Sequence, residues 1–64
     1  MIKLFSYVKT KKDKTFSTPK RFVKAGSFGY VVEALSNIEP FEYLVEINNN
    51  VYEYFEEELE IQYK

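Results

Sequence analysis

Cysteine and histidine are both absent from this chain of 64 residues. Without cysteine there is no disulfide, and without either residue there is no soft-ligand metal site. The two cross-links that usually stabilise very small domains are therefore excluded. The same absences exclude a Ser–His or Cys–His nucleophile. We therefore expect a protein that is not an enzyme and that carries no metal or other cofactor.

Long apolar runs are missing as well. No segment approaches the roughly 18 apolar residues of a membrane span, and the N-terminal stretch lacks the apolar core of a secretion signal. We expect a cytoplasmic protein without membrane contact. The six Tyr and six Phe make up 19% of the residues and must supply the core, because a chain this short forms one domain with little apolar surface to bury. We expect a single domain over residues 1–64 that needs every apolar residue.

Charge is divided along the chain, although the net charge is only −1. Residues 1–24 hold eight of the nine basic groups and one acid, giving +7, whereas residues 25–64 hold nine glutamates and one lysine, giving −8. Either the basic half folds back on the acidic half, or the surface carries two patches of opposite sign that steer a charged partner.

Short strands are predicted where apolar residues alternate or run together. They cover residues 2–8, 30–35 and 41–47, a second hairpin strand that ends at Phe55, and a last strand that holds Leu59 and Ile61. The three glutamates at 56–58 are typical of a single, solvated helical turn. The predicted strand at residues 2–8 is expected at an exposed edge of the sheet. Lys3 and Lys9 make pairing with a second copy there unfavourable, so a monomer is expected.

The connections have their own signals. Residues 10–20 are polar, contain Pro19 and have one apolar anchor, Phe16, so they are predicted to form a long loop. Residues 21–24 extend a short strand into a turn at Gly26 and Gly29, which supply positive φ angles.

The register of the second hairpin follows from parity. With a two-residue loop drawn from residues 48–50, odd positions of the first strand face even positions of the second, so Tyr52 and Tyr54 share the buried face that holds Tyr43. A three-residue loop would place Glu53 on that face. Because a slip of one residue moves the whole apolar set, the even-numbered loop is favoured, and the three tyrosines are assigned to the core.

These elements predict an all-β fold: a small SH3-like barrel of about five strands, with a long first loop and one helical turn before the last strand. The chain resembles the small SH3-like barrel proteins of Gram-positive phages and prophages, in which a Gly-x-x-Gly loop precedes a strand, a Tyr-rich hairpin and an acidic turn. The residues that carry the resemblance are Gly26 and Gly29, the strand 30–35, Tyr54-Phe55 and Glu58-Leu59. It implies the fold and a phage or mobile-element origin, and it transfers no active-site residues.

Two charged regions are the candidate contact sites. One is the basic segment 9–24, and the other is the acidic face of the second hairpin, where a turn at residues 49–50 would place Glu46 directly opposite Glu53. The cation that neutralises those glutamates belongs either to the chain's own loop or to a partner protein. The candidate residues are Lys11, Lys12, Lys14, Phe16, Lys20, Arg21, Glu42, Glu46 and Glu53.

The leading hypothesis is a non-enzymatic protein-interaction module that acts on a host or phage protein through this charged surface. The alternative is a small nucleic-acid-binding barrel in which the lysines of segment 9–24 contact phosphates and its phenylalanines stack on bases.

Overall fold

The chain is all-β in the computed structural model, which describes residues 1–17 and 19–63; Thr18 in the predicted loop and Lys64 lie outside the described residues. The described strands are β1 (Tyr7–Thr10), β2 (Lys14–Ser17), β3 (Lys20–Val23), β4 (Phe28–Ala34), β5 (Glu42–Ile47), β6 (Asn50–Phe55) and β7 (Leu59–Ile61). A 3-10 helix, η1 (Glu56–Glu58), precedes β7. In the described part of the chain, no helix has the length and apolar character that crossing a bilayer requires.

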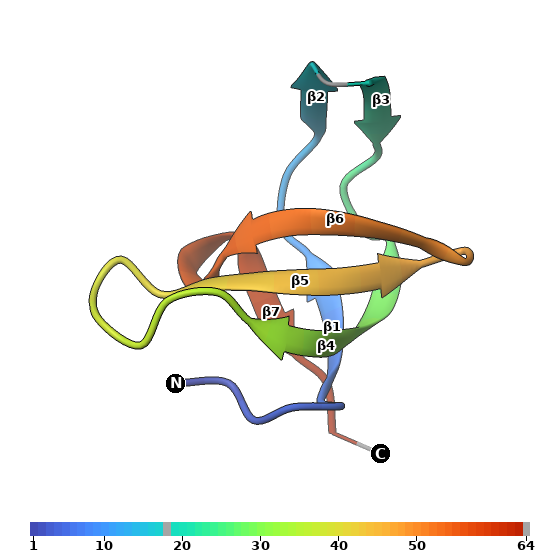
Figure 1. Cartoon of the computed structure of the whole chain (residues 1–64). Coiled ribbons are helices and arrows are strands. Elements are labelled where there is room, and N and C mark those ends of the chain that lie inside the picture. The colour runs from blue at the N-terminus through green and yellow to red at the C-terminus, as the bar shows by residue number, and fades with distance from the viewer. Residues whose placement is uncertain (18, 64) are drawn as a thin grey trace.

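Five of the strands form one antiparallel sheet in the order β6-β5-β4-β1-β7, and β2 and β3 form a separate hairpin that stands above it (Figure 1). The large sheet bends so that β4, β5 and β6 lie in front of β1 and β7 (Figure 1), with the core between them. The buried apolar residues are Ile2, Val8, Val23, Val31, Tyr43, Val45, Ile47, Tyr52, Tyr54 and Leu59.

The prediction of an all-β chain with a helical turn before the last strand is confirmed. The strand count differs from the predicted five, because β2 and β3 add a second sheet. Among the described strands, β6 and β7 end the large sheet without pairing to each other, so the sheet is not a closed barrel.

The first predicted strand, residues 2–8, is wrong over most of its length, since β1 covers only Tyr7–Thr10. Phe5 has a φ of +68°, and the Ser6 N–H donates to the Lys3 carbonyl, so the chain turns before β1. The turn carries Ile2 into the core, where its N–H donates to the Tyr43 hydroxyl at 2.9 Å. Leu4, which alternation places beside Ile2, is 51% exposed instead.

The predicted loop at residues 10–20 contains β2, which pairs with β3 to form a hairpin that we call the arm. The register places Lys14 opposite Val23 and Phe16 opposite Arg21. Alternation along β2 is weak, because Phe16 is its only apolar residue. The arm is held instead by contacts that its side chains make with β6.

The β5–β6 hairpin has the predicted even-numbered loop. Asn48 and Asn49 form it with φ angles of +51° and +68°, the left-handed conformation that a primed two-residue turn requires and that asparagine tolerates. Tyr43 lies opposite Tyr54, which confirms that odd positions of β5 pair with even positions of β6, and these rings lie in the core.

The turn lies one residue earlier than the position that would pair Glu46 with Glu53. Glu46 is opposite Val51, and Glu53 is opposite Leu44. The predicted like-charge pair is therefore wrong, and the two glutamates are diagonal neighbours on one face of the hairpin.

The two glycines have different roles. Gly26 has a φ of +87° and supplies the predicted positive φ. Gly29 lies in β4 and is buried, and a Cβ there would overlap the Glu46 carbonyl oxygen and lie 2.7 Å from Ile47 Cγ1. Gly29 is thus required by the close approach of β4 and β5 and not by a turn.

Candidate functional site

The arm has an inner face that lies against β6. Phe16 contacts both core tyrosines of that strand, with ring centroids 5.1 Å from Tyr52 and 5.6 Å from Tyr54. The Arg21 guanidinium carbon lies 4.5 Å from the Tyr52 centroid, and Lys14 Nζ lies 4.7 Å from the Tyr54 centroid. Three predicted contact residues, Lys14, Phe16 and Arg21, therefore hold the arm to its own sheet.

The same side chains reach the outward edge of β6. Lys14 Nζ donates to the Glu53 carbonyl at 3.0 Å, and Arg21 Nη1 donates to the Val51 carbonyl at 3.1 Å. Because β6 ends the sheet, these carbonyls point away from β5 and are satisfied by the arm.

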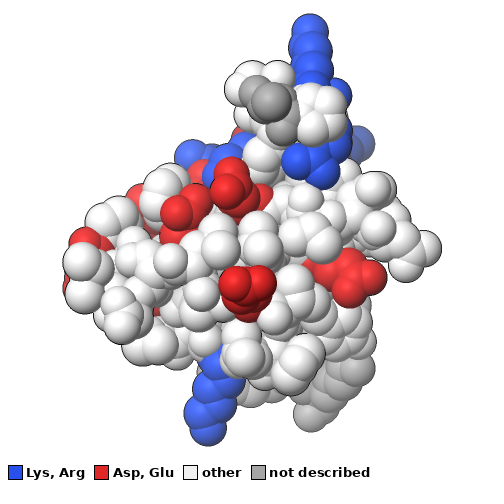
Figure 2. All heavy atoms as spheres, in the orientation of Figure 1, with Lys and Arg blue, Asp and Glu red and all other residues white. Residues whose placement is uncertain are grey.

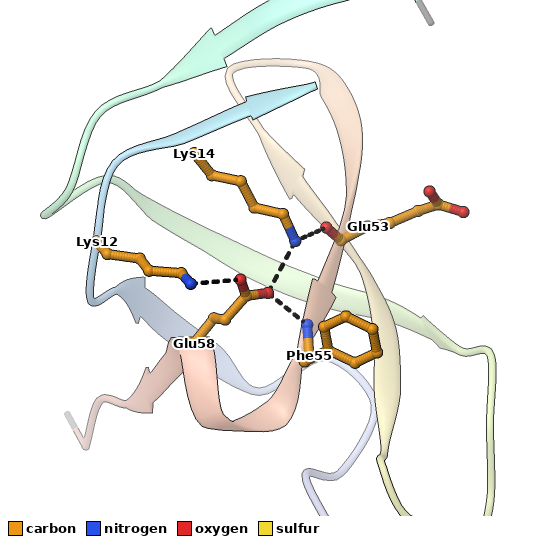
Figure 3. Close-up of polar contacts among 5 residues, drawn as sticks. All are labelled: Lys12, Lys14, Glu53, Phe55 and Glu58. Atoms are coloured by element: carbon orange, nitrogen blue, oxygen red, sulfur yellow. Dashed lines mark hydrogen bonds and ion pairs between the residues drawn. The ribbon is translucent and has the colours of Figure 1, made fainter. Parts of the chain in front are cut away.

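Glu58 is the buried centre of an ionic cluster that joins the arm to η1 (Figure 3). Its side chain is only 8% exposed; Oε1 accepts from Lys14 Nζ at 2.8 Å, and Oε2 lies 3.3 Å from Lys12 Nζ. Oε1 also accepts from the Phe55 N–H at 2.8 Å, which caps the helical turn. The prediction that all three glutamates at 56–58 are solvated is therefore wrong for Glu58.

The environment of Glu58 sets its charge. Burial by itself raises the pKa of the carboxyl, but the hydrogen bonds from Lys14 and Phe55, with the charge of Lys14 and a contribution from Lys12, outweigh burial and hold the pKa below its ordinary value. Glu58 is therefore an anion at neutral pH, neutralised by the chain's own lysines.

Tyr54 lies against this cluster and shows the opposite effect. Its side chain is fully buried, and burial together with the nearby Glu58 charge raises the pKa of its hydroxyl to about 12. The phenol is therefore neutral at neutral pH, where Glu58 is charged.

The basic segment neutralises few of the other acids. Among the described residues, the carboxylates in ion pairs are Glu58 and also Glu56, whose Oε2 lies 3.7 Å from the Met1 amino group. Lys11 and Lys20, both predicted contact residues, are exposed and make no ion pair within residues 1–17 and 19–63. Internal pairing of the basic segment with acidic residues is therefore limited to Lys12 and Lys14. Both pair with Glu58 and not, as one alternative predicts, with the glutamates of the sheet.

The sheet glutamates lie together on the outer side of β4, β5 and β6, a surface that we call the acidic face. Cross-strand partners point to the same side of a sheet, and the registers place two rows there. One row is Tyr30, Glu46 and Val51; the next is Glu33, Leu44 and Glu53; Glu42 follows, opposite Phe55. Figure 2 shows red side chains over the strands in front and blue ones gathered above them on the arm.

Apolar surface accompanies the glutamates. Tyr30 is 43% exposed and Val51 is 42% exposed, on either side of Glu46. Tyr7 lies next to Tyr30, with ring centroids 5.0 Å apart, and stacks on Phe28 at 5.4 Å. The expectation that every apolar residue enters the core is therefore wrong, and several exposed side chains gather beside the acidic face.

A hollow of about 320 Å³ lies beyond Glu42, between the β4–β5 connection and η1. Its lining is mixed, with three apolar residues and three glutamates: Glu39, Pro40, Phe41, Phe55, Glu56 and Glu57. One of the three carboxylates is fixed by the core, because Glu56 Oε1 accepts from the Tyr43 hydroxyl at 3.0 Å. Within the described residues, no group of three or more acidic side chains converges to hold a metal ion.

Of the predicted contact residues, the structure brings Glu42, Glu46 and Glu53 onto one surface, and it places Lys11 and Lys20 elsewhere. Sequence reasoning missed Glu33, because a β-bulge between Val31 and Glu33 reverses the alternation within β4 and brings Glu33 to the same side as Tyr30. It also missed the hollow, whose lining residues come from two separate segments. The sequence did contain a signal for Tyr30. Pairing of β4 with β5 by alternation places Tyr30 on the same side of the sheet as Glu46.

Comparison of this chain with protein-family models, with curated proteins and with solved structures finds no match.

Proposed function

We propose that this protein is a non-enzymatic interaction module of SH3-like architecture whose acidic face binds a basic surface on a partner protein. The architecture is supported by one bent five-stranded sheet, a hairpin arm in the first long connection and a 3-10 turn before the last strand. The resemblance to small SH3-like phage proteins implies the same arrangement.

One observation carries the proposed function: among the described residues, the lysines that form ion pairs, Lys12 and Lys14, both bind Glu58, and no ion pair reaches the acidic face. Glu46 and Glu53 are exposed and form no ion pair with any described residue. Four glutamates on one small face repel one another, and a basic partner surface would relieve that repulsion and accelerate association.

The apolar side chains supply the remaining contact. Tyrosine is enriched among residues that dominate binding energy, because it buries a large area with few rotatable bonds. Tyr30 and Val51 flank Glu46, so a partner's basic side chain would reach the carboxylate while its alkyl stem lies on apolar surface. The hollow beyond Glu42 extends this mixed apolar and acidic surface.

The test compares charge reversal on and off the acidic face. Wild type, Glu46→Lys and the matched control Glu60→Lys, an exposed position that lines neither the acidic face nor the hollow, are immobilised and exposed to lysate of the native host cell. The proteins captured by wild type are then purified and their affinity for each variant is measured. We expect a basic partner whose affinity falls at least tenfold with the first variant and is retained with the control. Equal binding to both variants, or no partner that binds after purification, would overturn the proposal.

A further inference from the structure

The arm has an outer face that takes no part in holding it to the sheet. Because side chains alternate along a strand and Ser17 pairs with Lys20 and Thr15 with Phe22, these four residues lie on the side opposite Phe16 and Arg21. All four are exposed. The arm is thus a small two-stranded sheet with one face covered by β6 and the other open to solvent.

The cations of segment 9–24 fall into two groups: those that make contacts within the protein and those that only face solvent. Lys9 lies over the Phe28 ring at 5.8 Å, Lys12 and Lys14 bind Glu58, and Arg21 binds the Val51 carbonyl. Within the described chain, the side chains of the remaining cations make no hydrogen bond or ion pair; they are Lys11, Lys20 and Lys24. Two of these lie along β3 and its continuation.

Phe22 lies between those two cations. It is 60% exposed, and no aromatic partner contacts its ring among the described residues. Lys20 and Phe22 are two residues apart within β3, so their side chains lie about 7 Å apart on the same side. The outer face therefore presents an ammonium group beside an aromatic ring, and Lys24 follows in sequence just after β3 ends.

We infer that the outer face of the arm binds single-stranded nucleic acid. Lys20 contacts a phosphate, and an unstacked base lies on the adjacent Phe22 ring, which is the combination of charge and stacking that non-specific single-strand binding uses. A duplex offers the phosphates but keeps its bases stacked, so single strands are favoured. Lysine contacts a phosphate as a point charge without reading base edges, so binding tolerates many sequences.

The outer face of the arm is on the side of β2 and β3 that points away from β6. On the face in view, basic side chains gather on the arm and acidic side chains lie directly beneath them (Figure 2). The outer face of the arm is separate from the acidic face of the proposed function, and the two are tested independently.

The test is fluorescence anisotropy with labelled 20-mers of deoxythymidine and uridine, titrated with the full chain in 20 mM and in 150 mM salt. We expect binding that weakens with salt. Lys20→Ala should lower the slope of log affinity against log salt by about 0.7, the value for one phosphate contact on a single strand. Phe22→Ala should weaken binding about fivefold or more, and Phe22→Tyr should retain it, because stacking needs only the ring.

Lys3→Ala is the matched control, since Lys3 is exposed and distant in sequence from the arm. Circular dichroism establishes that each variant is folded. Absence of binding by wild type at 100 µM protein in the low-salt buffer would overturn the inference, as would equal losses for Lys20→Ala and Lys3→Ala. Displacement of the oligonucleotide by an equal charge concentration of polyglutamate would also overturn it, because the site would then recognise acidic chains in general.

Discussion

Lys14 Nζ donates a 2.8 Å hydrogen bond to Glu58 Oε1 and so joins the first strand of the arm to the 3-10 helix, 44 positions further along the chain. The contact is largely buried, with the Lys14 side chain 22% exposed and that of Glu58 8% exposed. It links the position of the arm to the end of β6, because Glu58 also caps the Phe55 N–H.

Replacing Glu58 by Gln should destabilise the fold. Glutamine keeps an oxygen for the Phe55 N–H but removes the charge that Lys14 requires, and hydrogen bonds to charged groups contribute about 1.5–3 kcal/mol. Urea unfolding should show a loss of that size with an unchanged m-value. The control is Glu60→Gln, an exposed position with the same charge change, for which we expect less than about 0.5 kcal/mol. Equal effects of the two substitutions would contradict a structural role for the Glu58 carboxylate.

The contribution of Glu58 should depend on pH in the acid range. Its pKa in the folded protein is below the ordinary value of 4.5, so the unfolded chain takes up the proton first as the pH falls. The stabilisation is complete above pH 4.5 and is lost as the pH falls through the folded pKa. We expect the difference in unfolding free energy between wild type and Glu58→Gln to shrink between pH 6 and pH 3. A constant difference over that range would be inconsistent with the lowered pKa.

Tyr54 should produce the opposite dependence at alkaline pH. The pKa of its hydroxyl rises from 10.0 to about 12 on folding, so the neutral phenol stabilises the fold fully below pH 10, and this contribution is lost as the pH rises toward 12. The hydroxyl has no hydrogen-bond partner among the described residues, so Tyr54→Phe should cost little at pH 7. Ultraviolet titration of tyrosinate should show one fewer late-ionising group in this variant, and an unchanged titration above pH 11 would contradict the assignment.

Gly29→Ala should destabilise the pairing of β4 with β5. The added Cβ meets the Glu46 carbonyl and Ile47 Cγ1, and inserting a methyl group into a closely packed site costs about 1–3 kcal/mol. Thermal or urea unfolding measures the loss. Gly26→Ala provides the comparison, because nothing lies within 4 Å of its Cβ and its cost comes only from the positive φ. A Gly29→Ala variant as stable as wild type would show that the strands separate without penalty.

The two faces of the arm should respond differently to the same substitution. Phe16→Ala removes a ring that contacts Tyr52 and Tyr54, and we expect a loss of about 3 kcal/mol. Phe22→Ala removes an exposed ring from the opposite face, and we expect a change within about 0.5 kcal/mol. Chemical denaturation of both variants checks the expectation, which fails if Phe22→Ala destabilises as much as Phe16→Ala.

Local sequence patterns were sufficient for the β5–β6 hairpin. Alternation placed Tyr43, Tyr52 and Tyr54 in the core, and the left-handed tolerance of asparagine located a two-residue turn. Such features depend on residues that are close in sequence, and each has a period or a residue preference that marks it.

The arm and its ionic cluster could not be predicted in the same way. Strand β2 carries one apolar residue and is stabilised by β6, which lies more than 30 positions further on. Nothing local distinguishes Glu58 from its two neighbours, although it alone of the three is buried. The same limit applies to the candidate surfaces: the composition of the acidic face depends on a bulge in β4, and the hollow depends on how two distant segments approach.

The hydrogen bonds from Arg21 to the Val51 carbonyl and from Lys14 to the Glu53 carbonyl also affect solubility. A sheet edge with free backbone groups is a template on which a second chain adds a strand. The arm places two charged side chains along that edge, so a further strand would have to displace both cations and leave Glu58 without its closest partner. Weakening the arm therefore exposes a site for aggregation as well as lowering stability, and in this protein the arm protects β6 from intermolecular pairing.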